Sequence, residues 1–280
     1  MSKSNDRLRG LLIDLDGTLY QGSNRIDGAD RLIAYINKVK LPYQYVTNNS
    51  SVSAEEVAER LSAMGIPAQA SDVCTSAQAA AGYIADQAPG ASVFVIGESG
   101  LRSSLQEAGC RLTEDEQPDY VVQGIDRTMS YERMARAVRY IRAGARYVMT
   151  NPDLLLPSAD GLIPGAGSIG AMLQAASGER PVVIGKPSSI LMDYSLRRLG
   201  VPHSETWVIG DNIATDIAAG HAAGCKAVLV LTGLTHNDNL EQYAAAAGCR
   251  PDRICNTLDD LRYEIASNLS ANSMCREDKA

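Results

Sequence analysis

The sequence lacks the features that mark several broad classes of protein. No stretch approaches the ~18 consecutive apolar residues of a membrane-spanning helix. No two of its six cysteines are spaced as Cys-x-x-Cys, and none has a histidine at zinc-finger spacing. Basic residues are not in excess, because 26 lysines and arginines face 33 acidic residues for a net charge of −7. We therefore expect neither a membrane protein nor a structural zinc domain, nor a general binder of nucleic acid or membrane.

The N-terminal sequence also does not match the pattern of a secretory signal peptide. The apolar stretch that follows the polar N-terminus, Leu11 to Leu15, contains Asp14 and is too short for a signal peptide. The cysteines are then best interpreted as reduced thiols of a cytosolic protein. We predict a cytoplasmic location. The oligomeric state, a homo-oligomer included, is left open.

What is present indicates a globular protein of ordinary composition. Hydrophobic residues make up 45% and charged residues 21% of the 280 positions, which is typical of a folded domain. At about 150 residues per domain the length suggests two domains. A chain of this size buries roughly 75% of the surface that it exposes when unfolded.

Short apolar runs alternate with helical patterns along the chain. The runs that predict strands are Leu11–Ile13, Tyr43–Val46, Val93–Ile96, Tyr120–Val122, Tyr147–Met149, Val182–Ile184, Trp207–Ile209 and Ala227–Leu231. Between the first two, one helical face is shared by Leu32, Ile33, Ile36 and Val39. Ser53 and Glu56 form the pattern of a capping box at the start of another helix. This alternation predicts an α/β fold with a doubly wound, Rossmann-like parallel sheet.

Two clusters of turn-forming residues suggest that one domain is inserted into another. They lie at Gln87–Gly90 and Ala176–Arg180, and the residues between them carry their own strands and helices. We therefore predict a core built from residues 1–86 and 181–266, so that the strands after Pro181 belong to the core. Residues 87–180 would form a second, inserted α/β domain. The polar residues 267–280 predict a disordered tail.

The sharpest chemical signal is the sequence LLIDLDGTLY at Leu11–Tyr20. Asp14 and Asp16 are two residues apart, so both carboxylates face one side if the strand continues through them. Two acids at the end of a buried strand repel each other unless a cation is present. Oxygen ligands of this kind favour Mg²⁺. Taken alone, the motif is more often a turn that has no chemical role.

Three further segments with polar side chains also follow predicted strands. Thr47–Ser50 (TNNS) offers hydroxyl and amide donors, Gly185–Pro187 contains Lys186, and Gly210–Asp216 holds two more acids. Open parallel sheets place ligand sites outside the carboxyl ends of their strands. We expect these segments to meet Asp14 and its neighbours at one edge of the sheet, with acids for a metal ion and donors for a phosphate.

In this order the four segments resemble the motifs of the haloacid dehalogenase superfamily of phosphatases: DxDGT, a strand-terminal threonine, a lysine and GDxxxxD. The TNNS and GKPS sequences, with a large insert between the second and third motifs, resemble the NagD-like branch. The likeness extends over residues 8 to 262. It implies that residues 87–180 form a cap domain, in which the segment Asn151 to Gly167 faces the site.

The resemblance also implies roles for the acids. Asp14 would be the nucleophile, and Asp16 the acid/base that protonates the leaving oxygen. Asp14, the main-chain carbonyl of Asp16 and Asp211 would hold Mg²⁺, supported by Asp216. A carboxylate nucleophile divides hydrolysis into two steps through an aspartyl-phosphate.

The remaining motif residues would bind the phosphate. By the same resemblance, Thr47 and Lys186 hold the phosphoryl group, with Asn48 and Asn49 beside it. This assignment is chemically sensible, because phosphoryl transfer depends on alignment and charge neutralisation.

One motif argues for a different function. Gly165-Ala-Gly-Ser-Ile-Gly170 matches the GxGxxG pattern of dinucleotide-binding proteins. That fingerprint requires a full strand before it and an acid about 20 residues later. Here only two apolar residues precede Pro164, and Gly185 stands twenty positions after Gly165. We therefore do not expect a dehydrogenase.

The function expected from the sequence is that of a Mg²⁺-dependent phosphatase. Its partner would be a small phosphorylated metabolite, with sugar or sugar-acid phosphates first and nucleoside monophosphates as the alternative. A non-catalytic binding protein on the same fold is a further alternative, which the intact motif residues disfavour. The acids Glu114, Asp115 and Glu116 are expected to form a solvated loop.

Overall fold

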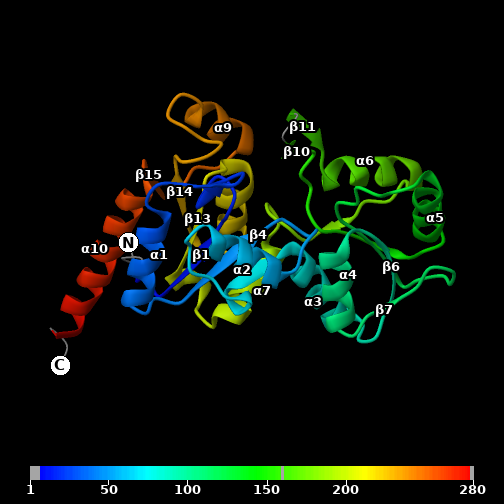
Figure 1. The fold of residues 1–280 in the computed structure, drawn as a ribbon, viewed down its shortest axis with the longest axis horizontal. Coiled ribbons are helices and arrows are strands. Elements are labelled where there is room, and N and C mark those ends of the chain that lie inside the picture. The colour runs from blue at the N-terminus through cyan, green and yellow to red at the C-terminus, as the bar shows by residue number, and fades with distance from the viewer. Residues whose placement is uncertain (1–6, 159–160, 278–280) are drawn as a thin grey trace. The chain divides into compact units, whose positions relative to one another are not determined.

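The computed structural model describes residues 7–158 and 161–277, which fold into two compact units (Figure 1). Within the described residues, unit 1 consists of 7–46, 58–73 and 195–277, and unit 2 of 47–57 and 74–194. The chain thus passes between the units several times. Among these residues no helix is both long and apolar enough to cross a membrane.

Unit 1 is built on a six-stranded sheet. In sheet order its strands are β15 (Arg253–Cys255), β14 (Lys226–Val230), β13 (Thr206–Gly210), β1 (Gly10–Ile13), β4 (Tyr43–Thr47) and β5 (Val73–Thr75). Strand β1 lies inside the sheet, is wholly buried, and pairs in parallel with both β13 and β4. The carboxyl ends of β1 and β13 therefore lie at the same edge of the sheet. The motif acids come directly after these two strand ends.

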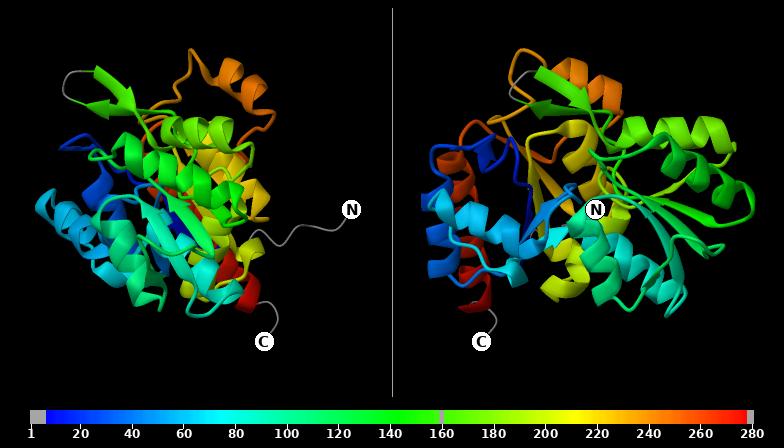
Figure 2. Two further views of the ribbon diagram at one scale, coloured as in Figure 1. Left: turned by 90° about the vertical axis from the view of Figure 1, so that its right-hand side faces the viewer. Right: turned by 45° about the vertical axis from the view of Figure 1, so that its right-hand side comes forward.

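Helices and short turns complete unit 1. Its elements include β2 (Tyr20–Gln21), β3 (Asn24–Arg25), α1 (Ala29–Lys38), η1 (Ala70–Asp72), η2 (His203–Glu205), η3 (Ile213–Ile217), α8 (Ala218–Ala222), α9 (Leu240–Ala247) and α10 (Leu258–Glu277). Helix α1 buries Leu32, Ile33 and Ile36 of the predicted face, whereas Val39, just beyond the last residue of the helix, is 38% exposed. It packs against α10, and both views of Figure 2 show these helices in blue and red. Four elements contribute residues to both units: strands β4 and β5 and the helices α2 (Ala54–Ala63) and α7 (Ser189–Leu199).

Unit 2 contains a five-stranded parallel sheet. In sheet order its strands are β12 (Val182–Val183), β9 (Arg146–Met149), β8 (Tyr120–Gln123), β6 (Ser92–Ile96) and β7 (Arg111–Leu112). Its other elements are α3 (Ser76–Gln87), α4 (Ser99–Glu107), α5 (Tyr131–Arg142), α6 (Ala166–Ser177) and the antiparallel hairpin of β10 (Leu155–Ser158) and β11 (Gly161–Pro164). Phe94, Val121, Ile141 and Leu173 are buried together where α5 and α6 pack against this sheet.

All eight strands expected from the sequence are present within one or two residues, and the α/β fold class is confirmed. One assignment is wrong. The run Val182–Ile184 forms a strand at Val182–Val183, but it pairs with β9 of the second sheet rather than with the core sheet. Consecutive elements usually stay adjacent, and the chain that leaves β9 through α6 returns beside the same strand. The domain boundaries at 87 and 180 stay a prediction.

The C-terminal segment also differs from the expectation. Helix α10 continues to Glu277, so residues 267–277 are helical rather than a disordered tail. Leu258, Leu261 and Ile265 bury one side of its first half. Further along, the Asn268 side-chain oxygen accepts a hydrogen bond from the Leu8 main-chain N–H at 3.0 Å. This contact attaches the helix at Asn268 to the segment that precedes β1. Residues 278–280 lie outside the described part of the chain.

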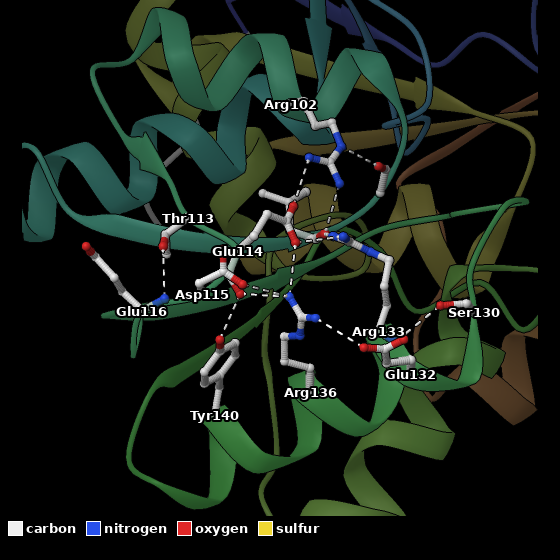
Figure 3. A network of polar contacts seen from close by, with 12 residues as sticks. Arg102, Thr113, Glu114, Asp115, Glu116, Ser130, Glu132, Arg133, Arg136 and Tyr140 are labelled. Atoms are coloured by element: carbon white, nitrogen blue, oxygen red, sulfur yellow. Dashed lines mark hydrogen bonds and ion pairs between the residues drawn. The ribbon is translucent and has the colours of Figure 1, made fainter.

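The side chains of Glu114, Asp115 and Glu116 are 43%, 95% and 67% exposed, as a solvated loop predicts, but Glu114 also takes part in a network of polar contacts (Figure 3). Its carboxylate lies 2.7 Å from a guanidinium nitrogen of Arg133 and 3.8 Å from one each of Arg102 and Arg136. Its main-chain oxygen accepts hydrogen bonds from Arg136 and Tyr140, each at 2.9 Å. The loop after β7 is therefore attached to both α4 and α5.

We expect the variant Glu114→Ala to lower the melting temperature by ~2–4 °C, equivalent to roughly 1 kcal/mol in a unit of this size. The effect is small because the Glu114 side chain is 43% exposed and solvent screens its ion pairs. Thermal unfolding followed by circular dichroism measures it. The control is Glu116→Ala, because that side chain lies on the same loop, is 67% exposed and pairs with Arg111 of β7. Equal melting temperatures for the two variants would show that the network adds no stability.

Candidate active site

Three acids of unit 1 lie together beyond the carboxyl ends of β1 and β13. One carboxylate oxygen from each of Asp14, Asp211 and Asp216 lies within 4.8 Å of the other two. All three side chains are buried, with exposures of 9%, 5% and 1%. Asp14 follows β1 directly, Asp211 follows β13 directly, and Asp216 lies in the π-helical turn η3. The parallel pairing of the two strands thus brings distant parts of the sequence to one point.

The backbone approaches this cluster closely at three glycines. A Cβ atom on Gly17 would lie 2.4 Å from Oδ2 of Asp211, and one on Gly233 would lie 2.2 Å from the same oxygen. A Cβ on Gly210 would lie 2.2 Å from Cγ of Asp216. Real Cβ atoms do not make such contacts. Gly17 also has a φ of +87°, which favours glycine on conformational grounds.

Hydrogen bonds fix the orientation of each carboxylate. The Thr18 hydroxyl donates to Oδ2 of Asp14 at 3.1 Å, and the Leu234 N–H donates to Oδ2 of Asp211 at 2.5 Å. The Asn212 N–H donates to Oδ2 of Asp216 at 3.1 Å. These contacts leave each acid in a defined position.

The segment Thr232–Thr235 was not anticipated from the sequence. The Thr232 hydroxyl donates to the Gly17 carbonyl at 2.8 Å, and the Thr235 N–H donates to the Asp211 carbonyl at 3.2 Å. The segment therefore connects the first motif to the last. Its sequence signal, a Thr-Gly pair soon after a strand, is also that of an ordinary turn.

Asp16 occupies a different environment from Asp14. Strand β1 ends at Ile13, before both acids, so the argument that a continuing strand aligns their carboxylates does not apply. Asp14 is buried, whereas Asp16 is accessible to solvent and its carboxylate is not part of the buried cluster. Partial desolvation and the nearby Asp14 carboxylate raise the pKa of Asp16, against the opposing effect of a hydrogen bond from the Gly22 backbone. A raised pKa suits a group that must donate a proton.

The polar residues of the second and third motifs lie together in unit 2. Thr47 is the last residue of β4, and its hydroxyl accepts a hydrogen bond from the Asn49 N–H at 3.1 Å. The Asn48 side chain bonds to both the N–H and the carbonyl of Lys186, at 2.8 and 3.1 Å. Lys186 is only 3% exposed. Thus Thr47, Asn48, Asn49 and Lys186 belong to one local structure.

The segment that was expected to face the site contacts this structure. The Asn48 side-chain nitrogen lies 3.2 Å from Oδ2 of Asp153, and the Asn151 side chain donates to the Asn48 carbonyl at 2.8 Å. The connection from β9 to the β10–β11 hairpin is therefore anchored on Asn48.

The GxGxxG motif has a packing role in the structure. Cβ atoms on Gly165 and Gly167 would lie 2.2 Å from the Asp153 carbonyl oxygen and 2.1 Å from that of Pro152. The strand before the motif, β11, pairs antiparallel with β10, so no βαβ unit precedes helix α6. The glycines allow close backbone contact, and the dinucleotide interpretation is not supported.

Comparison with known proteins agrees with this arrangement. Residues 11–111 match a family described as haloacid dehalogenase-like hydrolase, and residues 183–261 match a family described as HAD-hydrolase-like. The acid sugar phosphatase of Staphylococcus haemolyticus is 42% identical over 234 residues, which cover 84% of this chain and 89% of that protein.

Solved structures that are similar to this chain are also phosphatases. The p-nitrophenyl phosphatase from Archaeoglobus fulgidus superposes with a TM-score of 0.88 at 36% identity, covering 92% of this chain and 99% of that one. A glycerol phosphate phosphatase from Mycobacterium tuberculosis, solved in complex with calcium, gives a TM-score of 0.83 at 39% identity, covering 90% and 74%. The resemblance noted in the sequence is confirmed: the chain belongs to the haloacid dehalogenase-like hydrolases, in the NagD-like branch of their phosphomonoesterases.

Proposed function

We propose that this protein is a Mg²⁺-dependent phosphatase that hydrolyses small phosphorylated metabolites, with sugar or sugar-acid phosphates as its first substrate class. The observation that carries the proposal is the buried cluster of Asp14, Asp211 and Asp216. The name of the staphylococcal relative, acid sugar phosphatase, supports the substrate class. Nucleoside monophosphates remain the alternative class.

The acidic cluster fits a divalent ion. Three buried carboxylates whose oxygens lie within 4.8 Å repel one another unless positive charge compensates them. An all-oxygen donor set suits Mg²⁺, which binds few protein oxygens and retains water molecules. Asp14, Asp211 and the main-chain carbonyl of Asp16 would hold the ion, with Asp216 supporting them. When bound, it would supply positive charge that offsets the charge of the phosphoryl oxygens.

The two acids of the first motif would carry out the chemistry. A carboxylate oxygen of Asp14 attacks phosphorus, and the bond from phosphorus to the leaving oxygen breaks. Asp16, in its protonated form, gives its proton to that oxygen. In the second step a water molecule attacks the aspartyl-phosphate and transfers its proton to Asp16. This restores Asp14 and releases inorganic phosphate.

The motif residues of unit 2 would bind the group that is transferred. The Lys186 ammonium and the Thr47 hydroxyl hold the phosphoryl oxygens, with Asn48 and Asn49 beside them. Fixed donors of this kind stabilise the charge of the transition state without reorganising during the reaction. We further propose that the domain expected over residues 87–180 serves as a cap that provides selectivity among substrates.

The substrate proposal is tested with a panel of sugar phosphates, sugar-acid phosphates and nucleoside monophosphates, ranked by kcat/KM. We expect sugar or sugar-acid phosphates to rank first. Leu162→Ala should alter the ranking, because this leucine is 69% exposed on the hairpin of the expected cap. Glu114→Ala serves as the control and should leave the ranking unchanged. A panel led by nucleoside monophosphates would favour the alternative class.

We expect hydrolysis of p-nitrophenyl phosphate to require Mg²⁺ and to be restored poorly by calcium. Calcium seeks six to eight oxygen ligands in a larger and more flexible shell, which the few protein oxygens of this site do not supply. The measurement is activity after chelation and readdition of each ion. Full activity in excess chelator, or equal activity with calcium, would contradict the assigned metal site.

Replacing the two acids should give different results. Asp14→Asn should abolish turnover and remove any phosphoenzyme trapped from substrate, because the amide is not a competent nucleophile. Asp16→Asn should slow turnover at least ~10²-fold, the usual scale for loss of a positioned acid. That loss should shrink for substrates whose leaving groups need little protonation. Near-native turnover by Asp14→Asn would rule out the covalent mechanism.

A further inference from the structure

The side chain of Asn48 bonds to other protein groups through its oxygen and through both of its N–H donors. Its oxygen accepts a hydrogen bond from the Lys186 N–H at 2.8 Å, and its nitrogen donates to the Lys186 carbonyl at 3.1 Å. The same nitrogen donates to the Asp153 carboxylate at 3.2 Å. A primary amide has two N–H donors, so both are used. No donor of this side chain remains for a phosphate oxygen.

The main chain of Asn48 is equally constrained. Its carbonyl oxygen accepts hydrogen bonds from the Ser76 hydroxyl at 2.6 Å and from the Asn151 side chain at 2.8 Å. A Cβ atom on Gly185 would lie 2.5 Å from the Asn48 side-chain oxygen. Glycine at position 185 therefore allows the amide to approach the Lys186 backbone closely.

Lys186 needs such an anchor because it lies outside regular structure. Strand β12 ends at Val183, and helix α7 begins at Ser189. Before Lys186, the N–H groups of Ile184 and Gly185 donate to the Met149 and Thr150 carbonyls at 3.0 and 2.8 Å. At Lys186 itself, the partner is the Asn48 side-chain amide instead of a strand carbonyl. It pairs with both the main-chain N–H and the main-chain carbonyl of Lys186. The pairing fixes the point from which the long and flexible lysine side chain extends.

We propose that Asn48 is a positioning residue, which fixes the main chain of Lys186 and couples it to Asp153 instead of binding the phosphoryl group itself. The inference rests on the proposed function, in which Lys186 binds that group. It also makes Asp153 part of the phosphate-binding arrangement, although its negative charge is unsuited to direct contact with phosphate. A change at Asp153 then acts on Lys186 through Asn48.

A double-mutant cycle between Asn48→Ala and Lys186→Met tests the proposal. The readouts are kcat and KM for p-nitrophenyl phosphate and the inhibition constant of inorganic phosphate. We expect Asn48→Ala to lower kcat/KM and phosphate affinity at least ~10-fold in the natural chain, which is ~1.4 kcal/mol. In the Lys186→Met background the same change should cost less than ~3-fold. Losses that multiply in the double variant would show that Asn48 contacts the phosphoryl group independently, and would overturn the proposal.

Two further variants keep the result interpretable. Gln123→Ala is the matched control, because this buried amide in the same unit also donates to two main-chain carbonyls, those of Gly124 and Ala166. It should lower the melting temperature but leave phosphate inhibition unchanged. If Asn48→Ala fails to fold, Asn48→Asp replaces it in the cycle, since it keeps the volume and the acceptor but loses both donors.

The proposed function and this inference fail in different ways. Near-native kcat/KM in Lys186→Met would remove Lys186 from phosphate binding, and the proposed function would need revision at that residue. A low kcat/KM in Lys186→Met, together with losses from Asn48→Ala that multiply in the double variant, would leave the proposed function intact. Only the positioning role of Asn48 would then be refuted. A low kcat/KM in Lys186→Met that Asn48→Ala does not lower further supports both the proposed function and the positioning role.

Discussion

Electrostatic repulsion among three buried carboxylates is the constraint around which unit 1 is organised. Asp14, Asp211 and Asp216 lie close together where little water can screen their charges. Holding them there requires strands β1 and β13 to be adjacent and parallel, and requires a hydrogen-bond donor directed at each carboxylate. A cation bound among them would relieve this repulsion. Because it would bind the folded state and not the unfolded chain, it would also stabilise the fold.

Much of this arrangement could be predicted from the sequence because strands and motif residues are local signals. Each of the eight expected strands is a run of apolar residues that indicates burial, and Asp14 and Asp211 follow such runs directly. The sheet to which β12 belongs could not be predicted in this way. A two-residue strand carries no information about its partner, and only the return of the chain from α6 places it beside β9.

Long-range polar contacts were the least predictable part of the structure. Glu114 lies in a run of acids that resembles any solvated loop, and its arginine partners come from two separate helices. Asn48 follows a strand as a binding residue would, but its amide pairs with a backbone 138 residues away. In both cases the residue type indicates that a polar partner is needed without indicating which one. Such predictions are limited by the large number of polar groups that could serve as the partner, because the chemistry of the residue fits many of them.

The glycines that surround Asp211 have a consequence for the thermodynamics of folding. A glycine gives the unfolded chain more conformational freedom than alanine does, so Gly→Ala substitutions often stabilise proteins by lowering that entropy. At Gly17 and Gly233 a change to alanine cannot stabilise the protein in this way, because the added methyl group would occupy the position of the Asp211 carboxylate. The protein therefore carries an entropic penalty at these two positions in order to keep peptide backbone within van der Waals distance of a charged group. Consensus design for thermal stability should leave both positions unchanged and seek its gains elsewhere in the chain.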